Sequence, residues 1–219
     1  MMKITKRALL ACALAMSVSA CATTTTTLSL QDLDCGSCSD SVTDLLKKQD
    51  GVKDAIFRVV EAEVDVTHDP EVITAQAVRD ALYKGGFDVV LGAGQGSYEK
   101  GAGFKPDQDV RFLTSTGQRV DLTAALVPGK ITVVDFGADW CSPCRKLDEV
   151  MAGVLRKNPR VALRKVNIID WESPVAAQHL NGIAELPYVR VYAPDGRVVA
   201  TISGLKPDAI MGAIEEAGR

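Results

Sequence analysis

The chain has 219 residues, of which 47% are hydrophobic and only 5% aromatic, and its formal net charge is −3. This length suits one or two globular domains with ordinary cores. A slightly acidic chain lacks the basic surface that phosphate backbones require, so we expect no nucleic-acid partner. The six cysteines lie at positions 12, 21, 35, 38, 141 and 144, and the last four form two C-x-x-C pairs.

The first twenty residues have the layout of a secretory leader. Three basic residues, Lys3, Lys6 and Arg7, precede an apolar stretch that is too short to span a bilayer comfortably. The stretch ends in the sequence Val-Ser-Ala-Cys21, which resembles the processing site of bacterial lipoproteins. That resemblance implies a signal peptide over 1–20 and a lipid on the sulfur of Cys21.

The expected location of the mature protein follows from this leader. Ala22, rather than Asp, follows the lipidated cysteine, which resembles lipoproteins that are passed on to the outer membrane. A polar tether over 21–27 then carries a periplasm-facing lipoprotein in the bacterial cell envelope. Ordinary cleavage after Ala20 stays open as an alternative, because Val18 and Ala20 also satisfy the small-residue rule. In both cases the mature chain lies outside the inner membrane.

Residues 28–91 predict a first module of alternating strands and helices. Hydrophobic spacing and breaker residues predict a strand at 28–33, a helix at 41–48, strands at 55–60 and 63–67, a helix at 72–84 with Val72, Val78 and Leu82 inward, and a strand at 87–91. Gly51 and the pair Gly85-Gly86 end the two helices. The order βαββαβ is that of a ferredoxin-like sandwich.

This module resembles the heavy-metal-associated domain of metallochaperones and metal-pumping ATPases. The matching segments are Leu33-Asp-Cys-Gly-Ser-Cys38, Val64-x-Val66 followed by Asp69-Pro70, and Gly86-Phe87. The resemblance implies that Cys35 and Cys38 bind a soft metal ion through paired thiolates in an exposed loop. Sulfur ligands favour Cu(I), with Zn(II)-class ions next.

Two aspartates depart from the family pattern around this loop. Asp32 stands where the family usually has Gly, and Asp34 stands where many copper carriers have Thr or His. The carboxylate of Asp34 is a candidate third ligand, which would shift the preference toward Zn²⁺, Cd²⁺ or Pb²⁺. The alternative is that Asp34 only caps the following helix. The alternative for Cys35 and Cys38 is a simple disulfide outside the cytosol.

Residues 92–109 predict a linker, and the stretch 92–103 is rich in Gly. By composition this stretch is a flexible coil, with a span of about 20 Å and a stretched limit near ~40 Å. A tether of this length gives each module an effective concentration of about 1 mM near the other. The second module can therefore reach the first without a separate encounter.

Residues 110–219 predict an α/β module. In chain order we expect a hairpin of strands at 110–113 and 118–122, a buried strand at 131–136, a helix at 141–157, a strand at 161–167, a helix at 174–180, a hairpin at 188–193 and 198–203, and a helix at 209–217.

The stretch 131–145 carries the chemistry of this module. A β-branched apolar run leads into Cys141-Ser-Pro-Cys144, which places two cysteines on the first turn of a helix. Free backbone N–H groups and the positive dipole end stabilise the thiolate of Cys141 there. Pro143 fits the same turn, because its missing N–H would be unpaired anyway. Cys144 is placed to attack a mixed disulfide at Cys141, so the stretch predicts a dithiol redox site.

Residues 118–219 resemble thioredoxin. Within and just before them, Gly117-Gln-Arg-Val-Asp-Leu122 and Gly129-Lys130 resemble the membrane-tethered, periplasmic thioredoxin-like group. The matches, in order, are Phe136-Gly-Ala-Asp-Trp140, Cys141-Ser-Pro-Cys144, Leu186-Pro187 and Gly204. The resemblance implies a thioredoxin fold, Cys141 as nucleophile and Cys144 as resolving thiol. It also implies a cis Pro187 beside them, where the neighbouring backbone pairs with the substrate.

Three further residues take roles from this resemblance. Asp135 falls where the family keeps a buried acid, and Lys165 matches a lysine that pairs with it. A desolvated acid can accept and return the proton of Cys144. Trp140 shields the disulfide. Each role has an alternative: Asp135 could reach solvent at a strand end, Lys165 could be exposed, and Trp140 could only pack. Ser142 stands where Gly is commoner in the family, so the resemblance does not fix the redox potential.

The sequence therefore predicts an envelope thiol–disulfide oxidoreductase that acts on protein disulfides and needs no cofactor at its redox site. If it works as a reductant, it draws electrons from a membrane donor.

Three hypotheses connect the modules. The second module keeps Cys35 and Cys38 reduced so that they can load metal; or metal binding and delivery is the main activity of the lipoprotein, with thiol exchange maintaining those cysteines; or the first module only docks substrates.

Overall fold

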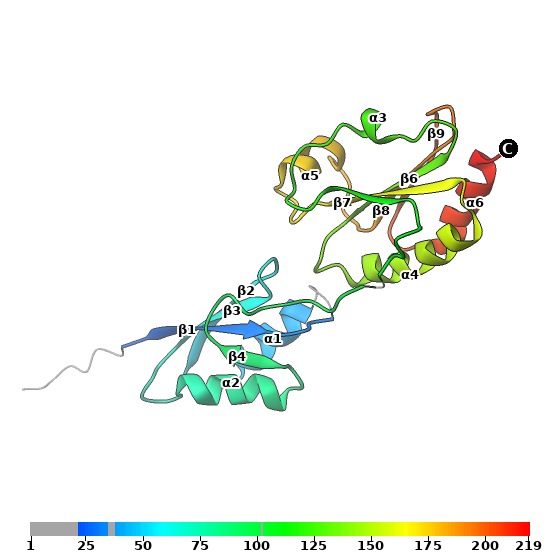
Figure 1. Cartoon of the computed structure of the whole chain (residues 1–219). Coiled ribbons are helices and arrows are strands. Elements are labelled where there is room, and N and C mark those ends of the chain that lie inside the picture. Colours follow the sequence, from blue (N-terminus) through cyan, green and yellow to red (C-terminus); the bar gives the residue numbers. More distant parts are fainter. Residues whose placement is uncertain (1–21, 35–37, 102) are drawn as a thin grey trace, which may run out of the picture.

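The structure, a computed structural model, describes residues 22–34, 38–101 and 103–219. They form two domains, each with one β-sheet (Figure 1). The hydrophobic core of the first domain is separate from the two cores of the second. The signal peptide, the lipidation site at Cys21 and the ligand Cys35 lie outside the described residues, so these remain predictions. None of the helices in the described ranges combines the length and hydropathy of a membrane span.

The first domain is a four-stranded antiparallel sheet covered on one face by two helices (Figure 1). Its strands lie in the order β2-β3-β1-β4, with bounds β1 Thr24–Leu30, β2 Val52–Arg58, β3 Glu63–His68 and β4 Val89–Leu91. The helices are α1, Ser39–Lys47, and α2, Ala75–Lys84. Alternate strand residues such as Leu28 and Val64 pack with Val42 and Leu82 from the helices, and all four are fully buried. The predicted βαββαβ order is confirmed.

Two local expectations for this domain are wrong. Thr24–Thr27, predicted as tether, forms the first half of β1 and pairs with β3. The second helix begins at Ala75 rather than residue 72, because the Thr74 side chain accepts a hydrogen bond from Ala77 N and caps the helix there. Val72 therefore precedes the helix, in a turn, and is 59% exposed instead of facing the core.

The Gly-rich segment that follows β4 is not the free coil that its composition predicts. Its backbone bonds to the end of β1 and the residues beyond it: Ser97 N donates to Leu30 O at 2.9 Å, and Leu33 N donates to Ser97 O at 2.9 Å. Glu63, a buried acid, accepts a hydrogen bond from Gly94 N. The Gly-rich composition indicates flexibility, but backbone groups of β1 and of the residues after it form hydrogen bonds with the segment at almost every second residue.

The second domain is a five-stranded mixed sheet between two layers of helices (Figure 1). The strand order is β5-β7-β6-β8-β9, with bounds β5 Val110–Thr114, β6 Ile131–Gly137, β7 Val161–Asn167, β8 Tyr188–Tyr192 and β9 Val198–Ser203. The strands β5, β7 and β6 are parallel, β8 is antiparallel to β6, and β9 is antiparallel to β8. This is the thioredoxin fold that the sequence predicts.

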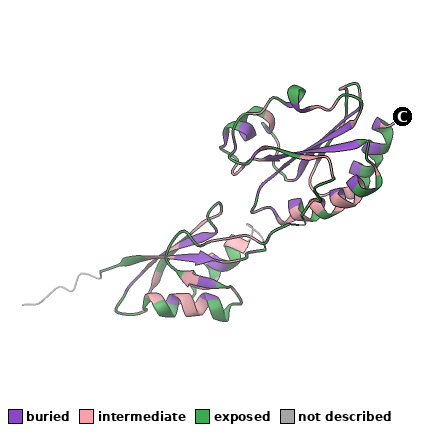
Figure 2. Cartoon of the chain, viewed as in Figure 1, coloured by how far each residue is buried: buried purple, intermediate pink, exposed green. Residues whose placement is uncertain are grey.

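The central strand β6 separates the two cores. All seven of its residues are buried (Figure 2). Val133 faces a core with α4, Ser142–Lys157, and α6, Pro207–Ala217. Val134 and Phe136 face the other core, with α3, Leu122–Ala125, and α5, Pro174–His179. Because side chains alternate along a strand, Asp135 lies on the face of Val133, beneath α4.

The hairpin expected at 110–113 and 118–122 is wrong. Strand β5 pairs in parallel with β7 at the edge of the sheet instead. Residues 118–121 form no strand, because the carboxylate of Asp121 accepts hydrogen bonds from Thr123 N and Ala124 N and starts α3 there. The predicted hairpin at 188–193 and 198–203 is confirmed as β8 and β9.

Candidate active site

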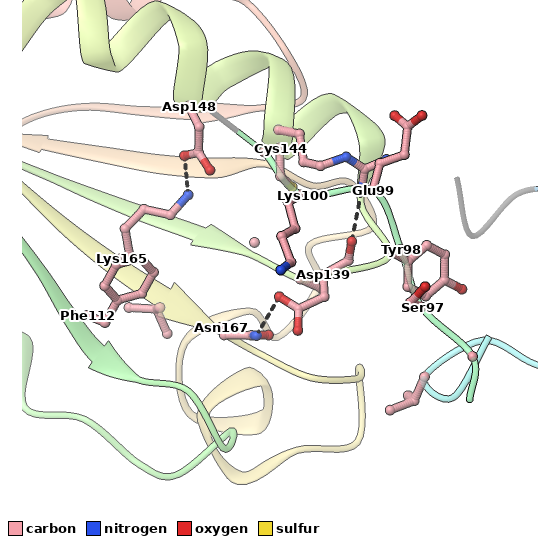
Figure 3. A pocket seen from close by; sticks show the side chains of 17 residues that line it. Ser97, Tyr98, Glu99, Lys100, Phe112, Asp139, Cys144, Asp148, Lys165 and Asn167 are labelled. Atoms are coloured by element: carbon pink, nitrogen blue, oxygen red, sulfur yellow. Dashed lines mark hydrogen bonds and ion pairs between the residues drawn. The ribbon is translucent and has the colours of Figure 1, made fainter. Parts of the chain in front are cut away.

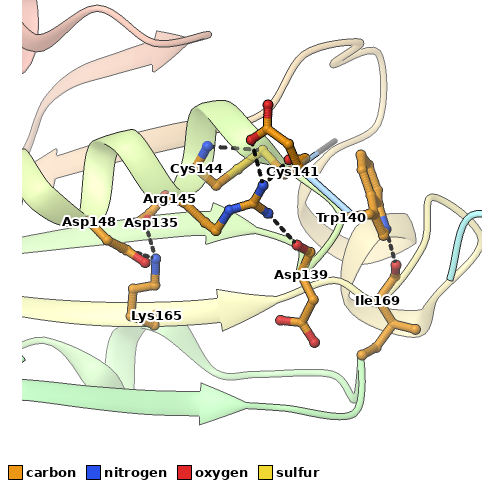
Figure 4. Close-up of a disulfide and its surroundings, with 10 residues drawn as sticks. Asp135, Asp139, Trp140, Cys141, Cys144, Arg145, Asp148, Lys165 and Ile169 are labelled. Atoms are coloured by element: carbon orange, nitrogen blue, oxygen red, sulfur yellow. Dashed lines mark hydrogen bonds and ion pairs between the residues drawn. A yellow bond between two sulfur atoms is a disulfide. The ribbon is translucent and has the colours of Figure 1, made fainter. Parts of the chain in front are cut away.

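Cys141 and Cys144 form a disulfide at the start of α4 (Figure 4). The Cα atoms of the pair are 5.3 Å apart. Cys141 is the N-cap residue of the helix, and its sulfur accepts a hydrogen bond from Cys144 N at 3.2 Å. Pro143 occupies the first turn, where its missing N–H leaves no partner unpaired. A helix N-terminus with a sulfur as its cap favours the anionic form of that sulfur once the bond is reduced.

Three charged side chains lie behind this disulfide. Lys165 Nζ donates to Asp135 Oδ2 at 2.6 Å, and it also contacts Asp148 Oδ1 (Figure 4). The Asp135 side chain is fully buried, whereas the Asp148 side chain keeps 16% of its surface exposed. One ammonium therefore bridges a buried carboxylate on β6 to a carboxylate on α4 that reaches the surface.

The pKa values of two members of this group are shifted. Burial alone would lower the pKa of Lys165, but the carboxylates of Asp135 and Asp148 raise it above its usual value. Burial raises the pKa of Asp148, Lys165 opposes that shift, and the charge of Asp135 adds to it. Lys165 is therefore held as a cation, and Asp148 takes up a proton more readily than an exposed aspartate.

Asp139 and Trp140 directly precede Cys141 in the chain and lie beside the disulfide (Figure 4). The Trp140 indole Nε1 donates to Ile169 O at 2.6 Å, which fixes the ring beside the disulfide (Figure 4). Asp139 is exposed, and its carboxylate accepts a hydrogen bond from Asn167 at 3.0 Å. Trp140 is half-buried, so the placement is compatible both with shielding the disulfide and with ordinary packing.

A groove of about 640 Å³ opens on the Cys141 side of the disulfide. The peptide bond between Leu186 and Pro187 is cis, as predicted, and Leu186 lines the groove with Trp140 and Cys141. Trp171, from the loop before α5, forms part of another wall and is 38% exposed. The nucleophile expected from the sequence is thus next to an open groove.

A second cleft, of about 470 Å³, lies on the Cys144 side, between the two domains (Figure 3). Cys144, Asp148 and Lys165 line one wall, and residues 96–101 line another. Tyr98 closes the far end: its hydroxyl donates to Val59 O at 2.6 Å, and burial raises its pKa to about 12, with Arg145 opposing and Glu61 adding to the shift. Cys144, the expected resolving cysteine, therefore faces a space that the first domain helps to enclose.

The two domains touch beside the active site. Asp34 Oδ1 accepts a hydrogen bond from Ser142 Oγ at 3.2 Å, and the guanidinium of Arg145 contacts both the carbonyl oxygen and the carboxylate of Asp34. Arg145 also donates to Asp139 O at 2.8 Å. Ser142 and Arg145 each adjoin one of the two active-site cysteines in the chain. The loop that begins at Asp34 therefore starts against the N-terminal turn of α4.

The chemistry of the donor set in this loop fits a soft metal ion only in its reduced form. Cys38 is the N-cap residue of α1 and is disulfide-bonded, and a metal ligand must be a thiolate. Cys35 lies outside the described residues. In the described part of the chain, no group of three or more His, Cys, Asp or Glu side chains gathers around a metal position. Asp34 is four residues before the cap of α1 and is engaged by the second domain, so its role as a third ligand remains a prediction.

Comparison with known proteins separates the two domains in the same way. A family model described as thioredoxin matches residues 119–216. A thioredoxin from Streptomyces clavuligerus is 35% identical over 82 residues, which are 37% of this chain and 73% of that protein. The chain belongs to the thioredoxin family. A model described as heavy-metal-associated domain matches residues 27–88.

Solved structures resemble each domain separately. A putative copper-ion-binding protein from Bacillus anthracis str. Ames is 27% identical and covers 32% of this chain and 100% of its own, with a TM-score of 0.31. Oxidized mitochondrial thioredoxin 3 from Saccharomyces cerevisiae is 26% identical and covers 40% of this chain and 79% of its own, with a TM-score of 0.34. The two family models give the two parts their names, the heavy-metal-associated domain and the thioredoxin domain.

The thioredoxin domain brings together all six residues predicted for its site. Cys141, Cys144 and Trp140 lie at the start of α4, Asp135 and Lys165 pair behind it, and Pro187 follows the cis bond. Sequence reasoning missed Asp148 and Arg145. The signal for Asp148 was available, because it is four residues after Cys144 and so lies on the same helix face. Nothing in the sequence pointed to the contact between Arg145 and Asp34.

Proposed function

We propose that this protein catalyses thiol–disulfide exchange on protein disulfides through Cys141 and Cys144. The observation that carries the proposal is the disulfide at the start of α4, with a buried carboxylate and lysine behind it and an open groove beside it. In the reduced protein the thiolate of Cys141 attacks a target disulfide. A mixed disulfide forms and one target thiolate leaves.

Cys144 then resolves the mixed disulfide. Its thiol loses a proton, its thiolate attacks Cys141 sulfur, and the second target thiolate is released as the Cys141–Cys144 bond forms. Asp135 is the proposed proton acceptor. It lies fully buried beneath α4, and its Oδ1 has no hydrogen-bond partner among the described residues, whereas Oδ2 is held by Lys165. A carboxylate held in position beside a thiol can act as its general base.

The roles of the groove residues complete this proposal. A substrate segment that lies in the groove is bounded by Trp140, Trp171 and the cis Leu186-Pro187 peptide. Its backbone can pair with the chain next to Pro187, and Trp140 limits the access of water to the sulfurs. The redox site needs no cofactor, because both electrons reside in the two cysteine sulfurs.

The location proposed for this activity is the bacterial envelope, with a lipid anchor at Cys21 in the outer membrane. The support is the leader sequence alone: three basic residues, a short apolar stretch and Val-Ser-Ala-Cys21. In an oxidising compartment a reductant must be reduced again after each cycle, so a membrane electron donor is part of the proposal.

The heavy-metal-associated domain supplies both a metal site and an internal partner in this proposal. Cys35 and Cys38 bind Cu(I) or a Zn(II)-class ion as cargo when they are reduced. Asp34, the residue before them, contacts Ser142 and Arg145 next to the active-site cysteines. This contact supports the proposal that the thioredoxin domain reduces the cysteines of its own chain. The alternative is a metal-delivery lipoprotein in which this maintenance is the only exchange reaction.

Insulin reduction by the reduced protein tests the enzymatic proposal. We expect the wild type to catalyse the reduction of insulin by dithiothreitol, and we expect a variant with Cys35→Ser and Cys38→Ser to keep this activity while it loses Cu(I) and Zn²⁺ binding. Activity on the first domain but not on insulin would favour the maintenance role. Absence of both reactions in the fully reduced wild type would refute the proposal.

A trapping experiment tests the internal partner. In the Cys144→Ser variant the mixed disulfide cannot be resolved, so Cys141 should remain bonded to a cysteine of the first domain, as detected by peptide mapping. Arg145→Ala removes the contact with Asp34 and should slow this trapping, while insulin reduction in an otherwise wild-type Arg145→Ala protein stays near its normal rate. Arg156→Ala, which removes an exposed arginine in the last turn of α4, is the matched control.

A further inference from the structure

Asp148 connects the buried acid of the redox site to solvent. It lies four residues after Cys144 on α4, so the two side chains share a helix face. Both line the interdomain cleft (Figure 3). Asp135, in contrast, is completely buried, and the described residues give it a single ionic partner, Lys165. A proton that Asp135 takes from Cys144 therefore needs a route out of the protein.

The hydrogen bonds of Lys165 provide such a route. Its Nζ contacts Asp135 on one side and Asp148 on the other, so one ammonium spans both carboxylates. The Lys165 side chain is only 10% exposed, which keeps competing water away from these two bonds. Two acids on one ammonium carry a net charge of −1, which leaves the group able to accept one proton without becoming positive.

We infer that Asp148 is a proton-relay residue that passes the proton of Cys144 from Asp135, through Lys165, to water in the interdomain cleft. This inference rests on the proposed thiol–disulfide exchange. Asp135 first takes the proton of the Cys144 thiol. Lys165 then gives a proton to Asp148 and receives one from Asp135, so that Lys165 is again an ammonium and Asp135 again a carboxylate. Asp148 finally releases its proton to water, and the Cys144 thiolate is free to attack Cys141.

The charges around Asp148 are consistent with this role. From β6 and β7 it faces Asp135 and Lys165. The other charged residues that line the cleft are Glu99 and Lys100 of the Gly-rich segment, and Asp139 and Arg145. Burial and the charge of Asp135 raise the pKa of Asp148, and Lys165 only partly opposes them. A raised pKa lets the carboxylate hold a proton briefly before it is released.

A two-step reaction of the reduced protein with 5,5′-dithiobis(2-nitrobenzoate) tests the relay. Attack by Cys141 releases the first coloured thiolate, and attack by Cys144 on the mixed disulfide releases the second. Asp148→Asn keeps the shape of the side chain but cannot carry a proton. We expect this variant to slow the second release by about 10- to 100-fold at pH 7 and to leave the first unchanged. The deficit should shrink at high pH, where hydroxide removes the proton directly, and with added imidazole.

Controls separate the relay from other effects. Glu149→Gln, an exposed acid on the same helix, should leave both releases unchanged, and Asp148→Glu should restore most of the second rate. If Asp148→Asn leaves the second release unchanged, or slows it equally at every pH and without rescue by imidazole, the relay is refuted although exchange still occurs. If the wild type shows no first release, the proposed function itself fails. Circular dichroism of each variant confirms that it is folded.

Discussion

The two domains carry the same C-x-x-C spacing at the start of a helix, but they surround it differently. In the thioredoxin domain, Cys141 caps the 16-residue helix α4 with a hydrogen bond from Cys144 N. In the heavy-metal-associated domain, Cys38 is the N-cap residue of the 9-residue helix α1 and makes no side-chain cap hydrogen bond. Cys141 is 4% exposed, whereas Cys38 is only half-buried. Spacing alone therefore does not determine the chemistry of a cysteine pair.

The residue one turn after the second cysteine shows the same contrast. In α1 this residue is Val42, which is fully buried in the apolar core. In α4 it is Asp148, which contacts Lys165 and through it Asp135. An exchange enzyme must move a proton each time the resolving cysteine reacts, whereas a metal loop needs only deprotonated sulfur. The polar group behind α4 matches the first requirement, and the apolar face of α1 is compatible with the second.

Cys141→Ser should have the largest effect on insulin reduction and so tests the contrast between the two cysteine pairs. A hydroxyl at this position is not a competent nucleophile for disulfides, so insulin reduction should fall by about 10³-fold or more. The matched substitution Cys38→Ser should leave insulin reduction near its normal rate and remove metal binding. The rates are measured by the turbidity of reduced insulin. If both substitutions abolish reduction equally, the two cysteine pairs form one site and the contrast is wrong.

Core substitutions test whether the two domains are stabilised independently. Leu46 in α1 and Leu147 in α4 are both fully buried, each in the core of its own domain. Leu46→Ala and Leu147→Ala should each cost about 2–5 kcal/mol of the free energy of unfolding. We expect calorimetry of the full chain to show that each substitution lowers the transition of its own domain. A single transition that both substitutions lower equally would show that the domains unfold as one unit.

Most elements of the fold could be predicted from the sequence because their hydrophobic period was clear. The run at 131–136 is apolar on both faces, as a central strand in a two-layered domain must be, and it matches β6 within one residue. The failures occurred where short polar groups decide the local structure. Thr74 and Asp121 each cap a helix and so moved or replaced an element that periodicity alone predicted.

The parts of the site that are formed by neighbouring residues in the sequence could be predicted. The two cysteines and the proline of α4 are adjacent in the sequence, and their helix-start chemistry follows directly from that order. The interdomain contact was not predictable, because it joins Asp34 to Arg145 across 111 residues. The same holds for the segment 92–99: its Gly-rich composition indicated flexibility, whereas its structure depends on backbone partners in β1 that composition does not report.

A smaller effect is expected from Gly96→Ala, which tests whether the Gly-rich segment (92–103) is fixed against the first domain. A Cβ at this position would lie 1.9 Å from Glu61 O and 2.7 Å from Ala62 O, and backbone atoms cannot move aside easily. We expect a loss of about 1–3 kcal/mol and faster proteolysis within the segment. Gly103→Ala is the matched control, since a Cβ there meets nothing within 4 Å. Equal proteolysis of both variants and the wild type would mean that the segment is already loose.

The smallest effect concerns the pH dependence of the thioredoxin domain. Burial lowers the pKa of His179, the hydrogen bond to Val120 O opposes this shift, and the charge of Arg190 adds to it. Between this lowered value and the unfolded value of about 6.5, the unfolded chain binds more protons than the folded one. Stability should therefore rise with pH through that window and be fully present above it.

The melting temperature of the thioredoxin domain should accordingly fall by a few degrees between pH 7.5 and pH 5.5. His179→Gln removes the titrating ring and keeps a polar side chain, so it should flatten this dependence while changing the value at pH 7.5 only slightly. Calorimetry at the two pH values gives both numbers, with the transition of the domain assigned by Leu147→Ala. A slope that persists in His179→Gln would show that other groups cause it. The raised pKa of Asp148 would not account for it, because a raised carboxyl pKa makes stability fall as the pH rises.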